Sequence, residues 1–416
     1  MTEEQRIRAV LVGIAARGSE LEECEISINE LERLLDTAGA ESVARVVQVK
    51  ESFDPRTCIG SGKVEEIRTV AENEGAELAV FDFELTPAQI RNLEDDLGGI
   101  SVIDRSMLIL DIFAKHAVTG EGKLQVELAQ LKYSAPRLIG KGKALSRQGG
   151  GIGSRGPGET KLETDRRHLK ERIATLEERL REMEHNRAVM RTSRDRSGIP
   201  KIAVVGYTNA GKSTLLNVLT GADVLAEDKL FATLDPTTRK LELPSGETVL
   251  ITDTVGFVRK LPHHLVNAFR STLDEVRFAD ILLIVSDITD PELSEHLAVT
   301  EEIAAQLGAG DKPKIFAYNK CDRIDNITDA NTENSVFISA LTGKGLSSLL
   351  SVIEKEIRRT KKRVLLTVPY SDQSVVSALY NSYSVEAADY TDDGIRVAVV
   401  LDAKGLGMYG KYITEA

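Results

Sequence analysis

The stretch "KIAVVGYTNAGKST", residues 201–214, decides the fold. An apolar run leads into G-x-x-x-x-G-K-S, and the helical pattern "TLLNVLTG" continues from it. In a strand, loop and helix of this kind, the loop amides and the positive end of the helix dipole point at a phosphate. Lys212 would reach the β- and γ-phosphates, and the Ser213 hydroxyl would ligate Mg²⁺. The stretch therefore predicts an α/β domain that binds a nucleoside triphosphate.

Four later motifs distinguish among the classes of P-loop proteins. Asp253 follows the apolar run "TVLIT" and opens D-x-x-G, so its carboxylate is expected near Mg²⁺ and the Gly256 amide near the γ-phosphate. The threonine-rich "FATLDPTTR" (231–239) stands where a first switch loop belongs. "KIFAYNKCD" (314–322) ends in N-K-x-D, and "SVFISAL" (335–341) ends in Ser-Ala-Leu. Five motifs in this order, each at the end of a strand pattern, resemble a GTPase domain of the translation-factor class.

The N-K-x-D motif indicates guanine rather than adenine. The Asp322 carboxylate can accept from both N1–H and the 2-amino group of guanine. Adenine offers neither donor, and a buried, unpaired carboxylate would cost about 1–3 kcal/mol or more. We expect Asn319 to face the base and brace the P-loop, the Lys320 stem to cover the base, and the Ala340 amide to bond guanine O6.

Two departures from the common pattern bear on hydrolysis. Phe257 stands directly after D-x-x-G, where Ras-like proteins carry a glutamine that orients the attacking water. A phenyl ring cannot orient water, so we expect slow hydrolysis until a partner completes the site. Asn209 lies inside the P-loop, where an asparagine in several related GTPases helps to hold a potassium ion; the alternative is that it only fills the loop.

The first hundred residues alternate strand and helix patterns. Strand patterns such as "RAVLVGIA" (8–15) and "ELAVFDF" (77–83) are separated by helical segments, which predicts a small parallel α/β domain. Within it, "IGSGKVEE" (59–66) resembles a phosphate loop but fails on spacing. Thr57 stands where a P-loop needs glycine, and Val64 follows Lys63 where Ser or Thr is required. We expect a turn into a helix there, with a contact to RNA or nucleotide as the alternative.

A helical hairpin is predicted between the two α/β regions. Residues 105–136 are strongly helical, and a heptad series of apolar residues follows the glycine-rich stretch 149–158: Leu162, Leu169, Ile173, Leu176, Leu180, Met183 and Met190. The stretch contains G-x-G-x-x-G, but the polar, basic "GKGKALSRQ" before it is not the strand that a dinucleotide turn requires. We expect it to be the flexible hairpin tip, flanked by Arg147, Arg155, Lys161, Arg166 and Arg167. "RTSRDRSGIP" (191–200) is expected to be a linker.

The charge is unevenly distributed. The chain carries a net charge of −12, yet residues 132–197 hold 17 Lys and Arg against 9 Asp and Glu. This segment predicts a local contact with a polyanion; the alternative is a solvated pair of charged helices. Three cysteines without metal-ligand spacing indicate reduced thiols, and neither a signal peptide nor a membrane span is evident. We expect a cytoplasmic monomer that binds no DNA, with peripheral membrane association left open.

Several longer stretches together resemble the HflX family of GTPases: "IGSGKVEE", "EGKLQVELAQLKY", "RQGGGIGSRGPGETKLETDRR", "TLDPTTR" and "DTVGF". The resemblance spans roughly residues 5 to 360. It implies binding to the large ribosomal subunit and its RNA through the basic hairpin and the N-terminal domain. It also implies splitting of stalled or stress-inactivated ribosomes, with the hairpin tip reaching towards the peptidyl transferase centre. Members have been credited with ATP hydrolysis or RNA unwinding by the N-terminal part, which the failed phosphate loop supports less well.

The resemblance carries roles onto individual positions. GTP or GDP would be bound by Gly206, Tyr207, Thr208, Asn209, Ala210, Gly211, Lys212, Ser213, Thr214, Asp253, Gly256, Asn319, Lys320, Asp322, Ser339, Ala340 and Leu341. Mg²⁺ would be held by Ser213, Thr233 and Asp253, with Thr237 as the reserve for Thr233. Catalysis would rest on Lys212, Thr233, Gly256 and Asn209, with potassium as a further ion if Asn209 holds one.

The expected architecture is α/β and has four parts. An N-terminal α/β subdomain (1–105) precedes a helical hairpin with a Gly-rich basic tip (106–197). A Ras-like P-loop GTPase domain with a mixed, mostly parallel sheet (198–362) follows, and a small α+β domain (363–416) ends the chain. The leading function is a GTPase whose hydrolysis the ribosome stimulates, in ribosome splitting, rescue or recycling. The alternatives are a GTPase of ribosome assembly or another RNP, and a GTP-responsive scaffold for protein or membrane.

Overall fold

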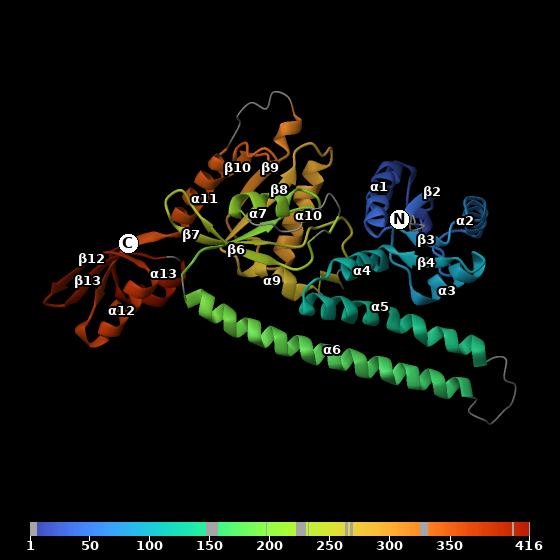
Figure 1. Cartoon of the computed structure of the whole chain (residues 1–416), viewed down its shortest axis with the longest axis horizontal. Helices are drawn as coiled ribbons and strands as arrows, with labels where there is room; N and C mark the ends of the chain where they lie inside the picture. Colours follow the sequence, from blue (N-terminus) through green and yellow to red (C-terminus); the bar gives the residue numbers. More distant parts are fainter. Residues whose placement is uncertain are drawn as a thin grey trace. The chain divides into compact units, whose positions relative to one another are not determined.

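The computed structural model describes most of the chain (Figure 1). The described residues are 6–146, 157–196, 198–221, 230–231, 233–262, 265–266, 269–324, 332–401 and 403–415. The chain divides into two compact units. The first comprises Met1–Met183, Glu227–Asp235 and Val255–Leu273, and the second comprises Glu184–Ala226, Pro236–Thr254 and Asp274–Ala416. The segments that follow the P-loop and the D-x-x-G motif thus belong in part to the first unit.

The first unit is built on a four-stranded sheet in the order β2-β1-β3-β4, in which every pairing is parallel. The central strand β1 has almost no exposed residue, as expected when helices cover both faces of a parallel sheet. The strands are β1 Arg8–Ala15, β2 Glu41–Val49, β3 Leu78–Phe81 and β4 Ser101–Asp104, and the helices are α1 Leu21–Thr37, α2 Ser61–Glu74, α3 Pro87–Asp96 and α4 Arg105–His116. The predicted parallel α/β domain is confirmed, and "IGSGKVEE" leads into α2 as a turn.

Two long helices follow, α5 Gly120–Ser146 and α6 Pro157–Arg196 (Figure 1). Of the heptad residues on α6, Leu176 is completely buried, whereas Leu169, Ile173, Leu180 and Met183 are half-buried. The glycine-rich stretch with Arg147 and Arg155 lies outside the described residues. The linker expected at 191–200 is wrong in its first part, because α6 continues to Arg196. No proline or glycine interrupts the charged, helix-favouring sequence before Gly198.

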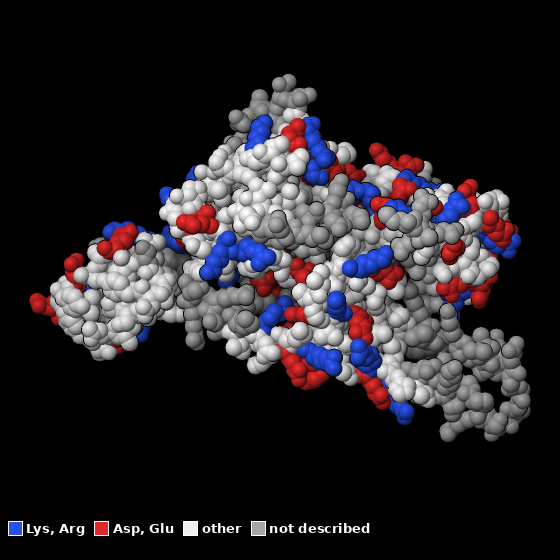
Figure 2. Space-filling model, viewed as in Figure 1, with Lys and Arg blue, Asp and Glu red and all other residues white. Residues whose placement is uncertain are grey.

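Charges on the described part of the hairpin are mixed. On the visible face of the hairpin, basic and acidic side chains lie beside one another (Figure 2). Several are paired, including Lys132 with Glu177 at 2.8 Å and Arg172 with Glu127 at 2.7 Å. The positive excess of the segment therefore falls mainly on side chains outside this described part.

The second unit contains a six-stranded sheet in the order β10-β9-β8-β5-β7-β6, parallel except for the antiparallel pair β6 and β7. This is the mixed, mostly parallel sheet that the P-loop motifs predict, and it confirms the fold class. The strands are β5 Lys201–Val205, β6 Thr237–Glu242, β7 Thr248–Asp253, β8 Ile281–Asp287, β9 Lys314–Asn319 and β10 Ser335–Phe337, and the helices are α7 Lys212–Thr220, α9 Arg270–Phe278, α10 Leu293–Gln306 and α11 Leu346–Thr360.

The end of the chain forms a separate antiparallel sheet in the order β12-β13-β11-β14. The elements run β-α-β-β-α-β, which is the ferredoxin-like arrangement. They are β11 Lys362–Val368, α12 Gln373–Ser382, β12 Ser384–Thr391, β13 Gly394–Leu401, α13 Ala403–Tyr409 and β14 Ile413–Glu415. The small α+β appendage is thereby confirmed and given a topology. Among the described residues, no helix is long and apolar enough to cross a membrane.

Candidate nucleotide site

The P-loop connects β5 to α7 at the carboxyl edge of the large sheet. Gly206 has φ 150° and Gly211 has φ 92°, both in the region that favours glycine. A Cβ on Gly206 would lie 2.1 Å from the carbonyl oxygen of Val285, and one on Gly211 would lie 2.2 Å from Nδ2 of Asn319. Both glycines of G-x-x-x-x-G-K-S are therefore required by backbone conformation and by close approach of neighbouring strands.

Lys212 begins α7 and is buried. Its Nζ donates to the main-chain carbonyls of Gly206 at 3.1 Å and Tyr207 at 2.8 Å, so the ammonium lies within the curve of the loop. Burial lowers the pKa of Lys212 to about 8, although the charge of Asp253 opposes that shift. The charge of Asp253 offsets only part of the burial of this ammonium, and a phosphate bound at the loop would add a further negative charge beside it.

Ser213 and Asp253 meet beside the loop. Asp253 is the last residue of β7, the strand next to β5, and is completely buried. The Ser213 hydroxyl donates to Asp253 Oδ2 at 2.6 Å. The Thr208 hydroxyl is buried and has no hydrogen-bond partner among the described residues. This edge of the sheet therefore gathers a cation, a hydroxyl and a carboxylate around a loop with an unsatisfied polar group.

Asn319 ties the N-K-x-D motif to the P-loop. It ends β9, is buried, and donates from Nδ2 to the carbonyl of Ala210 at 2.8 Å. Its Oδ1 accepts from the amide of Ala340 at 2.9 Å. The brace between Asn319 and the P-loop is thus present, and it also joins the Ser-Ala-Leu motif. In the structure the Ala340 amide serves Asn319, so its bond to guanine O6 stays a prediction.

The remaining base-site residues lie around the same strand ends. Lys320 has a left-handed backbone with φ 64°, and its Nζ lies 2.7 Å from Asp287 Oδ2. Ser339 is completely buried, and its hydroxyl accepts from the amide of Thr342. Leu341, in contrast, is largely exposed. Asp322 is exposed in a short 3-10 turn, so the burial assumed for its carboxylate is not provided by the described residues, and its partner would be the edge of the base.

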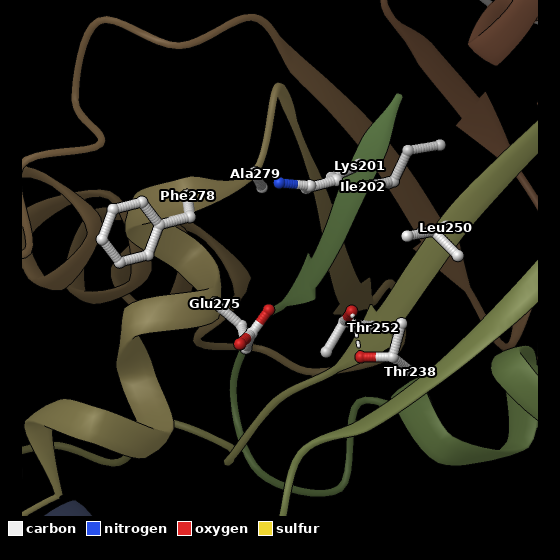
Figure 3. A pocket seen from close by; sticks show the side chains of 8 residues that line it. All are labelled: Lys201, Ile202, Thr238, Leu250, Thr252, Glu275, Phe278 and Ala279. Atoms are coloured by element: carbon white, nitrogen blue, oxygen red, sulfur yellow. Dashed lines mark hydrogen bonds between the residues drawn. The ribbon is translucent and has the colours of Figure 1, made fainter. Parts of the chain in front are cut away.

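One small cavity nearby is separate from these motifs. It lies between α9 and strands β5, β6 and β7, and the hydroxyls of Thr238 and Thr252 bond to each other at 2.9 Å beside it (Figure 3). Its volume of about 20 Å³ accommodates about one water molecule. No P-loop residue lines it, so it is not the nucleotide site.

Comparison with known proteins agrees with the motifs. Residues 25–114 match the family "GTP-binding GTPase N-terminal", residues 116–194 match "GTP-binding GTPase Middle Region", and residues 201–320 match "50S ribosome-binding GTPase". The GTPase HflX of Caldanaerobacter subterraneus is 51% identical over 94% of this chain and 90% of its own length. The chain belongs to the HflX family of GTPases. The GTPase HflX of Escherichia coli is 42% identical, covering 88% of this chain and 87% of that protein.

Membership of the HflX family confirms that the chain is a GTPase that binds GTP and GDP, as the motifs predict. Magnesium is typical of the class, and the residues present fit it. The Ser213 hydroxyl and Asp253 carboxylate are hard oxygen donors at hydrogen-bond distance from each other, and Mg²⁺ prefers such donors. These two residues would hold the ion, which would neutralise charge on the β- and γ-phosphates. Lys212 would take part from the loop.

The three predicted residues of the HflX switch segments are divided between the two units. Thr233 and Gly256 belong to the first unit, whereas Thr237 belongs to the second. Thr237 is the first residue of β6, in register with Asp253, so the ladder fixes its main chain. Thr233 is half-buried just before that strand. Asn209 adopts φ 62°, a left-handed conformation that asparagine tolerates better than most residues. The backbone conformation alone therefore gives one reason for an asparagine at this position.

Sequence reasoning missed three sets of long-range contacts in this HflX chain. Asp235 accepts bonds from the amides of Val118 and Thr119 at the start of α5. Buried Arg105 pairs with Glu30 and Asp82 and donates to the carbonyl of Arg259, while Lys260 contacts Asp82 at 2.8 Å. His296 stacks on Tyr207 of the P-loop. Each contact joins segments far apart in the sequence, and no local spacing signals it.

Proposed function

We propose that this chain is a GTPase of the large ribosomal subunit, whose hydrolysis that subunit stimulates and which serves ribosome splitting, rescue or recycling. The observation that carries the proposal is the match of residues 201–320 to a family described as "50S ribosome-binding GTPase". The P-loop, the D-x-x-G motif and the first two residues of N-K-x-D lie within the same residues. A GTPase of this class acts as a switch whose bound state depends on the nucleotide.

The proposal that a partner completes the active site rests on Phe257. The side chain after D-x-x-G is buried and apolar, so it offers no group to orient a water molecule. In this account Lys212, Gly256 and Thr233 stabilise the γ-phosphate, and Asn209 holds a potassium ion near it. The group that positions water comes from the ribosome.

Base recognition is assigned to residues at the ends of β9 and β10. Asn319, already bonded to the P-loop, keeps the motif in place, and Asp322 pairs with guanine N1–H and the 2-amino group. The Lys320 stem and Leu341 contact the base, and Ser339 and Ala340 belong to the loop that holds it. The exposed position of Asp322 suits a carboxylate that acquires its partner only when the base arrives.

RNA contact is assigned to the hairpin. The segment 132–197 has an excess of Lys and Arg, and the pairs described above occupy several basic residues of its middle. The contact with ribosomal RNA is assigned to the basic residues that flank the glycine-rich tip, Arg147, Arg155, Lys161, Arg166 and Arg167, together with the N-terminal domain. The chain acts as a monomer. It works in the cytoplasm, a reducing compartment in which its three cysteines stay free thiols.

Co-sedimentation tests the binding half of the proposal. The full chain is incubated with purified large or small subunits and with a non-hydrolysable GTP analogue or GDP. We expect binding to large subunits with the analogue, much less with GDP, and a steep loss of binding as salt rises. Equal pelleting in both nucleotide states, or pelleting with small subunits alone, would contradict it. Binding to assembly precursors but not to mature subunits would favour the assembly alternative.

A further inference from the structure

A histidine outside the sequence motifs contacts the P-loop. His296 lies in the first turn of α10, and its ring stacks on that of Tyr207 with centroids 3.6 Å apart and planes inclined by 13°. Both residues are buried, and Tyr207 directly follows the first P-loop glycine. An almost parallel stack at this distance fixes the position of the Tyr207 side chain against α10.

Two carboxylates face the histidine from different sides. Nδ1 of His296 lies 3.4 Å from Asp290 Oδ2, and Nε2 lies 3.5 Å from Glu292 Oε2. Asp290 is itself oriented by the main chain, since its Oδ1 accepts from the amide of Glu292 at 2.9 Å. A neutral imidazole donates from one nitrogen, whereas an imidazolium donates from both. Two carboxylates at the two nitrogens therefore complement the protonated ring.

The same tyrosine is connected to the phosphate-binding backbone. Its carbonyl accepts from Lys212 Nζ at 2.8 Å. The preceding residue, Gly206, has no free space, because a Cβ there would meet the Val285 carbonyl at 2.1 Å. Tyr207 therefore contacts α10 through its ring and the P-loop lysine through its main chain.

We propose that His296 is a positioning residue for the P-loop. Its protonated ring, held between Asp290 and Glu292, stacks on Tyr207 and keeps the loop in the form that binds nucleotide. Affinity for GTP and GDP therefore falls when the ring loses its proton. The proposal rests on the assignment of Gly206–Thr214 as the nucleotide loop.

The direction of the pH dependence follows from the groups around the ring. Asp290 and Glu292 face it from the segment that starts α10, Tyr207 covers one of its faces, and the P-loop adds the cation Lys212 at the Tyr207 main chain. Histidine changes charge around neutral pH. A neutral ring presents a lone pair instead of an N–H to one of the carboxylates. The stack on Tyr207 also loses the attraction between a cation and an aromatic face. Nucleotide binding should weaken as pH rises.

A divalent cation is the alternative occupant of the same three side chains. Asp290, Glu292 and His296 have donor atoms within 4.8 Å of one another. A metal ion would, however, need one ring nitrogen and both carboxylates to converge on one point. In the structure the two carboxylates lie at different nitrogens, which favours the imidazolium.

The test is the affinity of the full chain for a fluorescent GDP analogue between pH 5.5 and 8.5. We expect the wild-type affinity to fall by about three- to tenfold over this range, the size of a cation–aromatic contact. His296→Phe keeps a stacking ring without the charge and should lose most of that slope. Because Lys212 is present in both proteins, its own titration is common to both. His168→Phe, at an exposed histidine of α6, is the matched control and should keep the slope.

The outcomes separate this proposal from the site assignment. A slope in His296→Phe equal to that of the wild type would overturn the proposal, as would stoichiometric Zn²⁺ binding by the nucleotide-free chain that the variant loses. If His296→Phe fails to fold, Asp290→Asn answers the same question, since removing one carboxylate should move the change to lower pH. Lys212→Ala should bind no nucleotide at any pH. If it does bind, the P-loop assignment itself fails.

Discussion

Burial of the P-loop lysine lowers the stability of the nucleotide-free protein, and a bound nucleotide should relieve this destabilisation. In the nucleotide-free protein, burial lowers the pKa of Lys212 from 10.5 to about 8. Below pH 8 the folded and unfolded chains both carry the proton, so the burial penalty is complete. Between about pH 8 and 10.5 the folded protein loses the proton first, and its stability rises with pH.

Lys212→Met should therefore stabilise the nucleotide-free protein at pH 7, by on the order of 1–3 kcal/mol, because it removes a buried charge without removing volume. The difference from the wild type should shrink as pH approaches 10. Urea unfolding at pH 7 and 9.5 measures both quantities. A wild type that is the more stable protein at pH 7 without nucleotide would contradict this explanation.

Asp322 is expected to determine the choice of base. Asp322→Asn presents an amide where guanine offers two donors, so GTP affinity should fall about 10- to 100-fold, equivalent to roughly 1–3 kcal/mol. Xanthosine triphosphate, with a carbonyl in place of the 2-amino group, should gain affinity for the same variant. Competition binding of the two nucleotides measures the exchange. Asp311→Asn, at a loop carboxylate before β9 and outside the motif, should leave both affinities unchanged.

At the residue scale, the motif positions could be predicted and their neighbours could not. Spacing identified Lys212, Ser213 and Asp253 because the chemistry of phosphate and Mg²⁺ demands those groups near one another. The stack of Tyr207 on His296 arises from the tertiary approach of two segments, which leaves no trace in local spacing. The exposure of Asp322 was misjudged because burial by a ligand was taken for burial by the protein.

Among the elements, the start of α7 depends on the absence of a side chain at Gly211. Gly211 and Gly221 flank the helix, and both have positive φ, 92° and 64°. Only Gly211 is crowded, since a Cβ there would lie 2.2 Å from Asn319 Nδ2, whereas a Cβ on Gly221 would meet nothing within 4 Å. Gly211→Ala should abolish nucleotide binding and displace Asn319. Gly221→Ala should cost only about 1 kcal/mol of stability and keep binding, as calorimetry would measure.

The first hairpin helix begins on a residue of the threonine-rich segment. Asp235 Oδ2 accepts from the amides of Val118 at 2.9 Å and Thr119 at 2.8 Å, just before α5. Asp235→Ala should free these amides and destabilise that helix end by about 0.5–2 kcal/mol. Hydrogen exchange should then accelerate at residues 118–122. Asp235→Asn, which keeps one oxygen acceptor, should have the smaller effect, and unchanged exchange in both variants would refute the contact.

Element boundaries were predicted best where periodicity was strong. The strand at Arg8–Ala15 was predicted at its observed bounds because an unbroken run of apolar residues and one glycine follows Arg8. The helix to Arg196 was cut short because a polar, charged sequence was taken for a linker, although such residues favour an exposed helix. Between α4 and α5, the amides of Val118 and Thr119 bond to Asp235, a long-range contact that no local pattern encodes.

On the scale of the whole molecule, the segment after D-x-x-G packs with the N-terminal unit. Arg105 is buried, its guanidinium pairs with Asp82 at 2.7 Å, and it donates to the Arg259 carbonyl at 3.1 Å. Lys260 adds a second bond to Asp82 at 2.8 Å. Buried charges need such partners. The Arg259 carbonyl and the Lys260 ammonium therefore supply part of the hydrogen bonding and opposite charge around Arg105 and Asp82. The order of the domains could be predicted from the sequence, whereas this long-range pairing could not.

Stimulation of hydrolysis by the ribosome is the central claim. The measurement is single-turnover GTP hydrolysis by the full chain with increasing amounts of purified large subunits, and with small subunits as the control. Because Phe257 cannot orient water, we expect slow hydrolysis alone and an acceleration of at least about 10²-fold with large subunits, a modest part of what completing such a site can give. Lys212→Ala should hydrolyse nothing in either case. A rate that large subunits leave unchanged would contradict the account.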